Sequence, residues 1–379
     1  MRAKKVLSAL TAAALMFVPA ISAGAAGINA AEDSSDFMLD CNSRAGYDFL
    51  GTMENGEELQ AFYNRLYDKC VELWDDTDLN IRRDGEHYCY GEVWADDLSF
   101  QEMVIVYYTM RNDCPIFYFA DPLAAARDDT FLLMIDRNYC FGSDRKNIQE
   151  EVEYYIKNAA AQAENKETDH LKAKAVHDIL LEDLEYAFDW SGSPSEEAWA
   201  HNVVGATRNS GTCETYARLY QAIMNYMDID NYFVSGLSDG GEHAWNAVRL
   251  DDGLCYYVDC TWDDLLSDYT YFAKGEDTMS ADHTADTPTD DPQRFLIRLP
   301  DISRKDFDPE NAGKKPEYKL GDANNDGVVN VTDISMTAAH LKGIKALSSE
   351  ALERVDMNGD GFVTVTDVSA LAATVKGIR

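Results

Sequence analysis

Long apolar runs and positive charge are both scarce in this sequence. After Ala23, no stretch approaches the ~20 consecutive apolar residues that a membrane-spanning helix requires. The 379 residues include 33 Lys and Arg against 68 Asp and Glu, which gives a formal net charge of -35. A surface this acidic repels the phosphates of nucleic acids. We therefore expect no membrane span in the body of the chain and no nucleic-acid partner.

The chain begins, by contrast, with basic residues and an apolar run from Val6 to Ala23, followed by further small residues. This order is typical of a secretory signal peptide. A membrane anchor is the weaker interpretation, because the run is short and Ser8 and Pro19 interrupt it. We predict a signal peptide over residues 1–30 and a secreted, extracellular protein.

Residues 31–140 lack motifs that carry chemistry: they contain neither metal-ligand spacing nor a glycine-rich phosphate loop. Apolar residues recur at helical spacing between Leu59 and Leu73, which predicts a helix. The apolar run Met103–Tyr108 fits a helix or a strand, and the sequence Asn112–Pro115 predicts a turn after it. We interpret this stretch as an N-terminal accessory region.

Residues 141–302 contain a cysteine, a histidine and an aspartate in the order that a thiol nucleophile, its base and an orienting carboxylate require. Cys213 begins a helical pattern, so its sulfur is expected at the helix N-terminus, where the helix dipole and unpaired N–H groups favour the thiolate. A nearby imidazole would stabilise the thiolate further and later protonate a leaving amine. The N–H groups at the same helix end, including that of Cys213, would bind a developing oxyanion.

The segment between His243 and Asp259 predicts a hairpin that brings these two residues together. The loop 251–253, Asp-Asp-Gly, suits a type I turn followed by Gly253 in the left-handed conformation. That register pairs Trp245 with Asp259. It places His243 and Asp259 on the same face of the sheet as diagonal neighbours. A two-residue turn would move Asp259 to the other face, so the triad depends on this glycine.

Several short segments in this region resemble the transglutaminase-like, or papain-like, superfamily of cysteine enzymes. They are Ala175-Val-His-Asp178, His201-x-x-x-Gly205-Ala206, Gly211-Thr-Cys-Glu-Thr-Tyr-Ala217, His243-Ala-Trp-Asn246, Asp259-Cys-Thr-Trp-Asp-Asp264 and Asp282-His283. The resemblance implies an α+β domain over residues 141–302, in which a helix with an N-terminal cysteine packs on an antiparallel sheet. It implies that Cys213 is the nucleophile, His243 the base and acid, and Asp259 the orienting residue, with no cofactor.

Other residues of this domain have less defined roles. Members of the superfamily often place an aromatic or amide side chain upstream of the cysteine to bind the oxyanion, and Asn202 is the candidate here. Trp245 and Trp262 either wall the site or pack in the core. Three further histidines are interpreted as structural; they are His177, His201 and His283.

The sequence also predicts helix boundaries and the bonding state of some cysteines. Ser143 is a candidate N-cap for a helix, and residues 171–184 predict another. Cys255 and Cys260 are expected on one strand, where five residues span roughly 16 Å, too far for a mutual disulfide. If Cys213 is a free nucleophile, the odd number of remaining cysteines leaves at least one more thiol unpaired.

The C-terminal part of the chain repeats: residues 322–343 recur as residues 356–377. Each copy holds a twelve-residue loop with oxygen-bearing side chains at positions 1, 3, 5, 9 and 12 and glycine at position 6. Ca²⁺ prefers such an oxygen cage, with the carbonyl of position 7 as a further ligand. The ligands expected for two Ca²⁺ ions are Asp322, Asn324, Asp326, Val328, Asn330 and Asp333, then Asp356, Asn358, Asp360, Phe362, Thr364 and Asp367.

Two features separate these loops from the common EF-hand: position 12 is Asp rather than Glu, and we expect no helix before either loop. Together with the repeat, they resemble a type I dockerin over residues 320–379. The resemblance implies a small all-α domain that binds a cohesin module of a scaffold protein, as in cellulosomes. Residues 303–319 are expected to form the linker before it, because they contain almost no aliphatic residues and include Pro309, Gly313, Lys314, Lys315 and Pro316.

The sequence as a whole predicts a secreted, scaffold-docked cysteine enzyme that transfers acyl groups through a thioester at Cys213. Hydrolysis of a protein or peptide is the favoured reaction, and protein crosslinking by a transglutaminase is the alternative. A non-catalytic binding module that keeps the same fold remains open, as does a docked inhibitor or adaptor. No motif indicates the paired carboxylates of a glycosidase.

The repeat generates a testable prediction about partner binding. In dockerins, loop positions 10 and 11 help to select the cohesin, and both copies here carry the same pair, Val331-Thr332 and Val365-Thr366. We therefore expect two near-equivalent binding orientations related by a half-turn. Replacing one pair by alanines should leave cohesin affinity nearly unchanged in a calorimetric titration. A large loss from a single replaced pair would show that the two copies are not equivalent.

Overall fold

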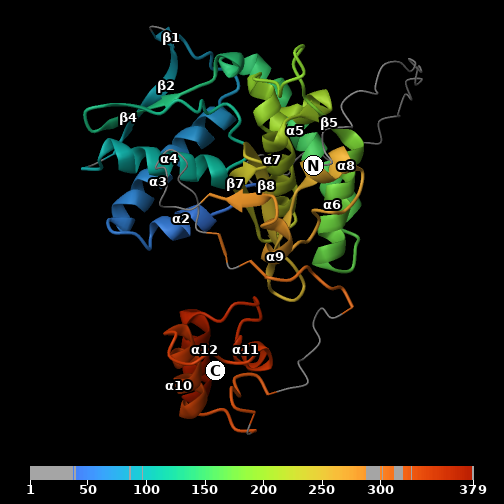
Figure 1. Ribbon diagram of the computed structural model, residues 1–379. Helices are drawn as coiled ribbons and strands as arrows, with labels where there is room; N and C mark the ends of the chain where they lie inside the picture. Colours follow the sequence, from blue (N-terminus) through green and yellow to red (C-terminus); the bar gives the residue numbers. More distant parts are fainter. Residues whose placement is uncertain are drawn as a thin grey trace. The chain divides into compact units, whose positions relative to one another are not determined.

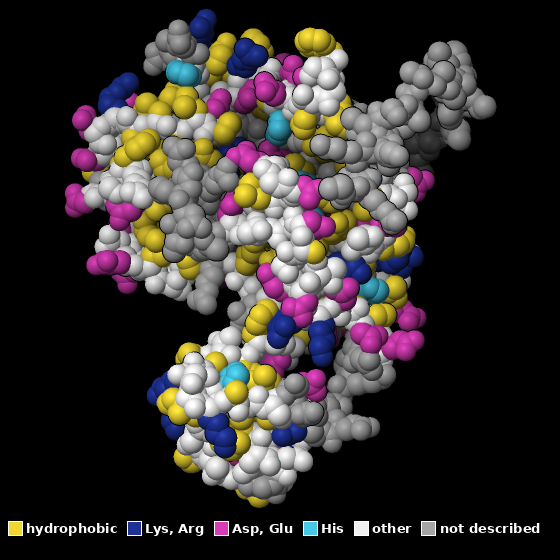
Figure 2. All heavy atoms as spheres, viewed as in Figure 1, with side chains coloured by type: hydrophobic (Ala, Val, Ile, Leu, Met, Phe, Trp, Pro, Cys, Tyr) yellow, Lys and Arg dark blue, Asp and Glu magenta, His cyan; other side chains and the backbone are white. Residues whose placement is uncertain are grey.

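A computed structural model describes residues 37, 40–84, 87–95, 97–286, 299–300, 302–310, 319–325 and 327–377 (Figure 1). The predicted signal peptide and the predicted ligand Asp326 lie outside the described residues. Within those residues, no helix combines the length and the apolar character needed to cross a membrane. Asp and Glu side chains are scattered over the face drawn in Figure 2, as the acidic composition leads one to expect.

Within its described residues, the N-terminal region combines three helices with a four-stranded sheet. As predicted, one face of the long helix α3 is buried from Leu59 to Leu73, and the ambiguous run 103–108 is helical. A capping box between Ser99 and Glu102 starts that helix, and it ends at Asp113, where the turn was expected. The elements are α2 (Ala45–Leu50), α3 (Gly56–Asp75) and α4 (Phe100–Asp113), with β1 (Arg83–Asp84), β2 (His87–Trp94), β3 (Ala125–Arg127) and β4 (Thr130–Met134) in the order β1-β2-β4-β3.

The following part of the chain packs helices on a second four-stranded sheet, which is antiparallel throughout and has the order β10-β7-β8-β9. The α+β class predicted from the sequence is confirmed. The helices are α5 (Gly142–Ala163), α6 (Asp169–Asp183), α7 (Cys213–Tyr226), α8 (Cys260–Leu266) and α9 (Glu276–Met279). The strands are β7 (Asn231–Ser238), β8 (Gly241–Arg249), β9 (Cys255–Val258) and β10 (His283–Ala285), and the short β5 (Glu185–Tyr186) pairs with β6 (Ser210–Gly211).

Helix α7 lies directly against this sheet. Ala217 of the helix packs with Phe233 of β7 and Ala244 of β8 in one small apolar cluster. The side chain of Asn246, on β8, donates a hydrogen bond of 3.0 Å to the carbonyl of Ala217. These contacts place the first residue of α7, Cys213, near the start of β8.

The hairpin between β8 and β9 has the predicted register. Gly253 has a φ of +84°, in the left-handed region, and its N–H donates to the carbonyl of Leu250 at 2.8 Å. Asn246 faces Val258 across the ladder, which puts Trp245 opposite Asp259. The glycine is required here because a side chain in this conformation meets the carbonyl that follows it.

Two local predictions are wrong. Ser143 does not cap a helix: α5 begins at Gly142, so the serine lies inside its first turn, and Phe141 occupies the N-cap position. Cys255 and Cys260 do not share a strand, because Asp259 ends the extended segment and caps α8. All eight cysteines lack disulfide bonds, and only Cys89 and Cys213 among them are not buried.

The core shows no break at the boundary predicted between residues 140 and 141. Phe62 and Tyr107 of the N-terminal region belong to the same hydrophobic core as Ile156 and Tyr220. The side chain of Gln221, on α7, donates to the carbonyl of Asn112 at 2.9 Å. The N-terminal region therefore packs directly on the helix that begins with Cys213.

The C-terminal repeat forms three helices, α10 (Val331–Leu341), α11 (Ser349–Val355) and α12 (Val365–Val375). As predicted, α10 and α12 follow the two loops, and glycines with positive φ come just after both, Gly343 and Gly377. The expectation of no helix before either loop is wrong for the second loop. Helix α11 precedes it, because Ser348 caps a short run of helix-forming residues.

Candidate functional site

Cys213 lies at the first position of α7, is half-buried, and borders a cavity of about 710 Å³. The side chain of its neighbour Thr212 does not cap the helix, because the hydroxyl donates instead to the carbonyl of Ala200 at 2.7 Å. The cavity draws its walls from the N-terminal region, from the segment around β5 and from the sheet. The lining residues include Tyr108, Arg111, Phe117, Tyr118, Tyr186, Pro194, Arg218, Phe233, Ser235 and His243.

His243 and Asp259 are in direct contact, as the predicted hairpin register requires. Nε2 of His243 lies 2.7 Å from Oδ2 of Asp259, and the side chains are 8% and 1% exposed. Burial by itself lowers the pKa of His243, but the charge of Asp259 and hydrogen bonds to Asp259 and Cys213 outweigh it and raise the pKa to about 10. The site therefore favours the imidazolium form of His243.

The other ring nitrogen of His243, Nδ1, is the one that faces the thiol of Cys213. Because Nε2 is bonded to Asp259, Nδ1 is the atom available for the side-chain hydrogen bond with Cys213. The structure thus brings together all three residues of the predicted triad. A thiolate beside an imidazolium, with the helix dipole behind it, is a nucleophile with its own proton donor.

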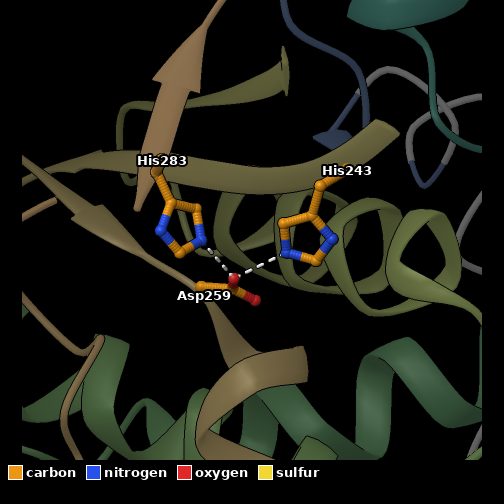
Figure 3. Close-up of side chains that lie close together, drawn as sticks. All are labelled: His243, Asp259 and His283. Atoms are coloured by element: carbon orange, nitrogen blue, oxygen red, sulfur yellow. Dashed lines mark hydrogen bonds and ion pairs between the residues drawn. The ribbon is translucent and has the colours of Figure 1, made fainter. Parts of the chain in front are cut away.

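Asp259 is held by four donors. Oδ1 accepts the N–H groups of Thr261 at 3.0 Å and Trp262 at 3.1 Å, at the start of α8. Oδ2 accepts from His243 and, at 3.0 Å, from Nε2 of His283 (Figure 3). Burial raises the pKa of Asp259, but the two histidines together lower it to about 2. This carboxylate stays charged at any pH near neutrality.

The contact of a second histidine with Asp259 was not anticipated from the sequence. His283 was interpreted as structural, and only its place beside Asp282 in the superfamily-like closing segment could have drawn attention to it. Of the other two histidines interpreted as structural, His177 is fully buried between Asp178 and Asp263. His201 binds Glu214 at 3.0 Å.

Asn202 lines the cavity, and its side-chain amide is engaged in local hydrogen bonds. Its Nδ2 donates to the carbonyl of Ala198 at 2.8 Å, and its Oδ1 accepts from the N–H of Val204 at 2.9 Å. The amide thus caps the short helix that follows it, and the oxyanion role expected for Asn202 stays a prediction.

Tyr186 lies beside the backbone of Cys213. It pairs with Gly211 across the β5–β6 ladder and lines the cavity. Burial raises the pKa of its hydroxyl to about 12, the nearby charge of Cys213 adds to this, and a hydrogen bond from the N–H of Cys213 opposes it. The Tyr186 hydroxyl and the Cys213 N–H therefore meet beside the sulfur.

The two tryptophans lie behind the histidine and are absent from the cavity lining given above. Trp245 is 1% exposed, and its ring stacks on that of His243 with centroids 5.9 Å apart. Trp262 meets His243 edge-on at 6.3 Å. Of the two expectations for these residues, core packing is the one that the structure supports, and it keeps water from the bond between His243 and Asp259.

The acidic loops of the C-terminal repeat turn their carboxylates inward. Asp322 accepts the N–H of Gly327 at 2.6 Å, and Asp356 accepts those of Gly359 and Gly361, each at 2.7 Å. The last aspartates of the two loops, Asp333 and Asp367, are fully buried. Each also accepts loop N–H groups.

Comparison with known families assigns two segments of this chain. Residues 157–260 match the transglutaminase-like superfamily, and residues 320–376 match the dockerin type I domain. The chain joins a transglutaminase-like domain to a dockerin. Both resemblances inferred from sequence motifs are thereby confirmed, and the first match spans Cys213, His243 and Asp259.

Comparison with solved structures finds partial similarity only. A crystal structure of a TGase is 16% identical, with a TM-score of 0.28, over 35% of this chain and 40% of that chain. A proposed cysteine protease from Cytophaga hutchinsonii is 22% identical, with a TM-score of 0.24, over 29% and 37%. This chain therefore spans about two fifths of the length of each. No curated protein matches the chain.

The dockerin loops fit Ca²⁺. Asp360 and Asp367 are buried close to Asp356, and their charges add to the effect of burial in raising the pKa of Asp356 to about 6. Grouped carboxylates of this kind are the ligands that a hard divalent cation prefers. Asn330 and Thr364, expected as ligands at position 9, also cap α10 and α12. Each loop carries three aspartates, so one bound Ca²⁺ would offset two of its three negative charges.

Calcium removal therefore gives a direct prediction. Because the ion offsets repulsion among buried aspartates, a chelator should lower the unfolding temperature of the dockerin, and excess Ca²⁺ should restore it. At a Ca²⁺ concentration one hundred times the dissociation constant, the expected gain is about 2.7 kcal/mol for each of the two sites. Calorimetry of the full chain measures this. A variant with both Asp322→Ala and Asp356→Ala should lose the Ca²⁺ response, and an unchanged response would contradict the loop assignment.

Proposed function

We propose that the protein is a secreted cysteine enzyme that transfers acyl groups through a thioester at Cys213, and that its dockerin attaches it to a cohesin of an extracellular scaffold. The observation that carries the proposal is the contact chain from Asp259 through His243 to Cys213 at the cavity. The dockerin match supports both the extracellular location and the cohesin partner, since dockerins of this type occur in secreted assemblies.

The first half of the reaction forms the thioester. The Cys213 thiolate attacks the carbonyl carbon of an amide, so that an S–C bond forms and the carbonyl oxygen becomes an oxyanion. The tetrahedral intermediate then collapses, the C–N bond breaks, and the proton on Nδ1 of His243 passes to the leaving amine. Asp259 keeps Nε2 of the imidazole protonated and aimed throughout.

The oxyanion is stabilised by the Cys213 N–H and the Tyr186 hydroxyl. In the resting site the N–H donates to the tyrosine oxygen, so the two groups lie side by side. A carbonyl oxygen that enters between them accepts both hydrogen bonds. The N–H then exchanges the tyrosine oxygen for the substrate oxygen, and both donors face the developing charge.

The second half of the reaction transfers the acyl group from sulfur to an acceptor. His243, now neutral, takes a proton from the acceptor, whose oxygen or nitrogen attacks the thioester and releases Cys213. Water needs no binding site of its own, so we favour hydrolysis of a protein or peptide. A lysine amine as acceptor would make the protein a crosslinking transglutaminase. A domain that binds protein without catalysis is the rival from another class.

The nucleophile assignment is tested with iodoacetamide and a casein substrate. We expect Cys213 to be labelled first and new peptide fragments to appear in the mass spectrum of the substrate. Cys213→Ala should abolish the fragments, since loss of a triad nucleophile costs on the order of 10⁶-fold. Cys89→Ala is the matched control, because Cys89 is the other cysteine that is not buried. Amine incorporation without cleavage would indicate a transglutaminase, and a Cys213 no more reactive than Cys89 would favour the binding module.

The role of Tyr186 is tested by removing one oxygen atom. Tyr186→Phe should lower kcat about 10²-fold, as loss of one oxyanion donor does, with KM nearly unchanged. Iodoacetamide labelling of Cys213 should remain fast, because that reaction forms no oxyanion. Tyr154→Phe, at a highly exposed tyrosine of α5, is the control. An unchanged kcat in Tyr186→Phe would remove the tyrosine from the mechanism.

A further inference from the structure

Two imidazoles meet on a single oxygen of Asp259. Nε2 of His243 lies 2.7 Å and Nε2 of His283 lies 3.0 Å from the same Oδ2 atom. Figure 3 shows that the two rings approach this atom from different strands. A triad needs only the first of these contacts, so the second requires its own explanation.

His283 is itself held firmly. Its Nδ1 lies 2.6 Å from Oδ1 of Asp282, whose Oδ2 accepts the hydroxyl of Tyr271 at 2.7 Å. The rings of Trp245 and Trp262 lie against the imidazole, each at a centroid distance of 5.2 Å. The side chain is 1% exposed. Tight packing and a bond at each nitrogen leave the ring one orientation.

The position of His283 gives its bond to Asp259 a mechanical consequence. His283 opens β10, which pairs with β7 and has no ladder to β8 or β9. The N–H groups of α8 restrain this carboxylate at Oδ1. Because both oxygens turn together about the Cβ–Cγ axis, any remaining swing also moves Oδ2 away from His243. A second donor on Oδ2, anchored in another strand, prevents that swing.

We infer that His283 is a positioning residue of the active site, which holds Oδ2 of Asp259 on His243 and thereby keeps the imidazole of His243 directed at Cys213. The inference rests on the proposed function of the triad. His283 itself touches neither the sulfur nor the cavity lining. Its effect on Cys213 passes through the bond to Asp259 and through His243, whose ring it also faces at a centroid distance of 5.6 Å.

A metal ion shared by His243, Asp259 and His283 is the competing explanation. One ligand atom from each residue lies within 4.8 Å of the others. However, both imidazole nitrogens already lie at hydrogen-bond distance from the carboxylate oxygen, and all three side chains make the bonds expected without an ion. A chelator arm in the experiment separates the two explanations.

The test compares His283→Gln with His283→Asn, two neutral amides with similar risk to folding. The amide nitrogen of glutamine falls near the Nε2 position and can still donate to Asp259. That of asparagine falls near the Nδ1 position and cannot reach it. The readout is the rate of Cys213 alkylation by iodoacetamide from pH 4 to pH 9, in a Cys89→Ala background, which needs no knowledge of the substrate.

We expect the asparagine variant to react about tenfold more slowly than wild type at pH 6, because a lost hydrogen bond to a charged group weakens the ion pair of Cys213 and His243 by about that factor. The acid limb of its profile should shift upward by about one pH unit. The glutamine variant should stay within about threefold of wild type. The titratable groups that face His283 are Asp259, Asp282, His243 and Tyr271, and both variants retain all four.

His177→Asn is the matched control. His177 is another fully buried histidine between carboxylates, with no bond to the triad, so its loss should lower the unfolding temperature and leave the alkylation profile unmoved. Equal loss in His283→Gln and His283→Asn would overturn the inference, as would a wild-type profile in His283→Asn. Loss of wild-type reactivity in a chelator would overturn it in favour of a metal. A wild-type Cys213 no more reactive than Cys70 would instead refute the proposed function itself.

Discussion

The carboxylate of Asp259 is the constraint on which the geometry of the site depends. A buried carboxylate is costly unless each oxygen finds donors. Here the donors come from the start of α8, from β8 through His243 and from β10 through His283. Satisfying this one group therefore holds three elements of the fold in a single arrangement. The same arrangement turns the imidazole of His243 toward the N-terminus of α7, where the sulfur of Cys213 lies.

Helix α7 both presents the thiol of Cys213 and anchors the N-terminal region. Its first residue presents the thiol, and its later residues hold the N-terminal region: Arg218 and Gln221 donate to the carbonyls of Arg111 and Asn112 at the end of α4. The cavity at Cys213 lies between these parts and takes lining from both. A region without any catalytic motif therefore shapes the space that a substrate enters. Helix α7 connects the N-terminal region to Cys213 through the bonds described above.

The calcium loops of the dockerin differ from the catalytic site, because the hydrogen bonds that hold their carboxylates join residues close together in the sequence. Within each loop, aspartates accept N–H groups a few residues away, and the last aspartate of each joins a capping box that starts the next helix. The cation that these loops fit would complete a cage already outlined by the backbone. The exposed Val331 and Val365 stand at equivalent places in the first turns of α10 and α12. The repeat in sequence is thus a repeat in structure.

The sequence by itself determined whatever depends on spacing along the chain. The calcium loops, the helix that starts at Cys213 and the glycine-dependent register that joins His243 to Asp259 all follow from a local pattern, because a turn or a helix converts spacing directly into position. Only the tertiary structure decided which side chains complete the site. Tyr186 reaches Cys213 through the pairing of β5 with β6, and His283 reaches Asp259 because β10 joins the sheet beside β7. The amide of Asn202, by contrast, is engaged in a local cap. Pairing between distant strands is set by packing and by the burial of polar groups. It therefore cannot be predicted from residue spacing along the chain.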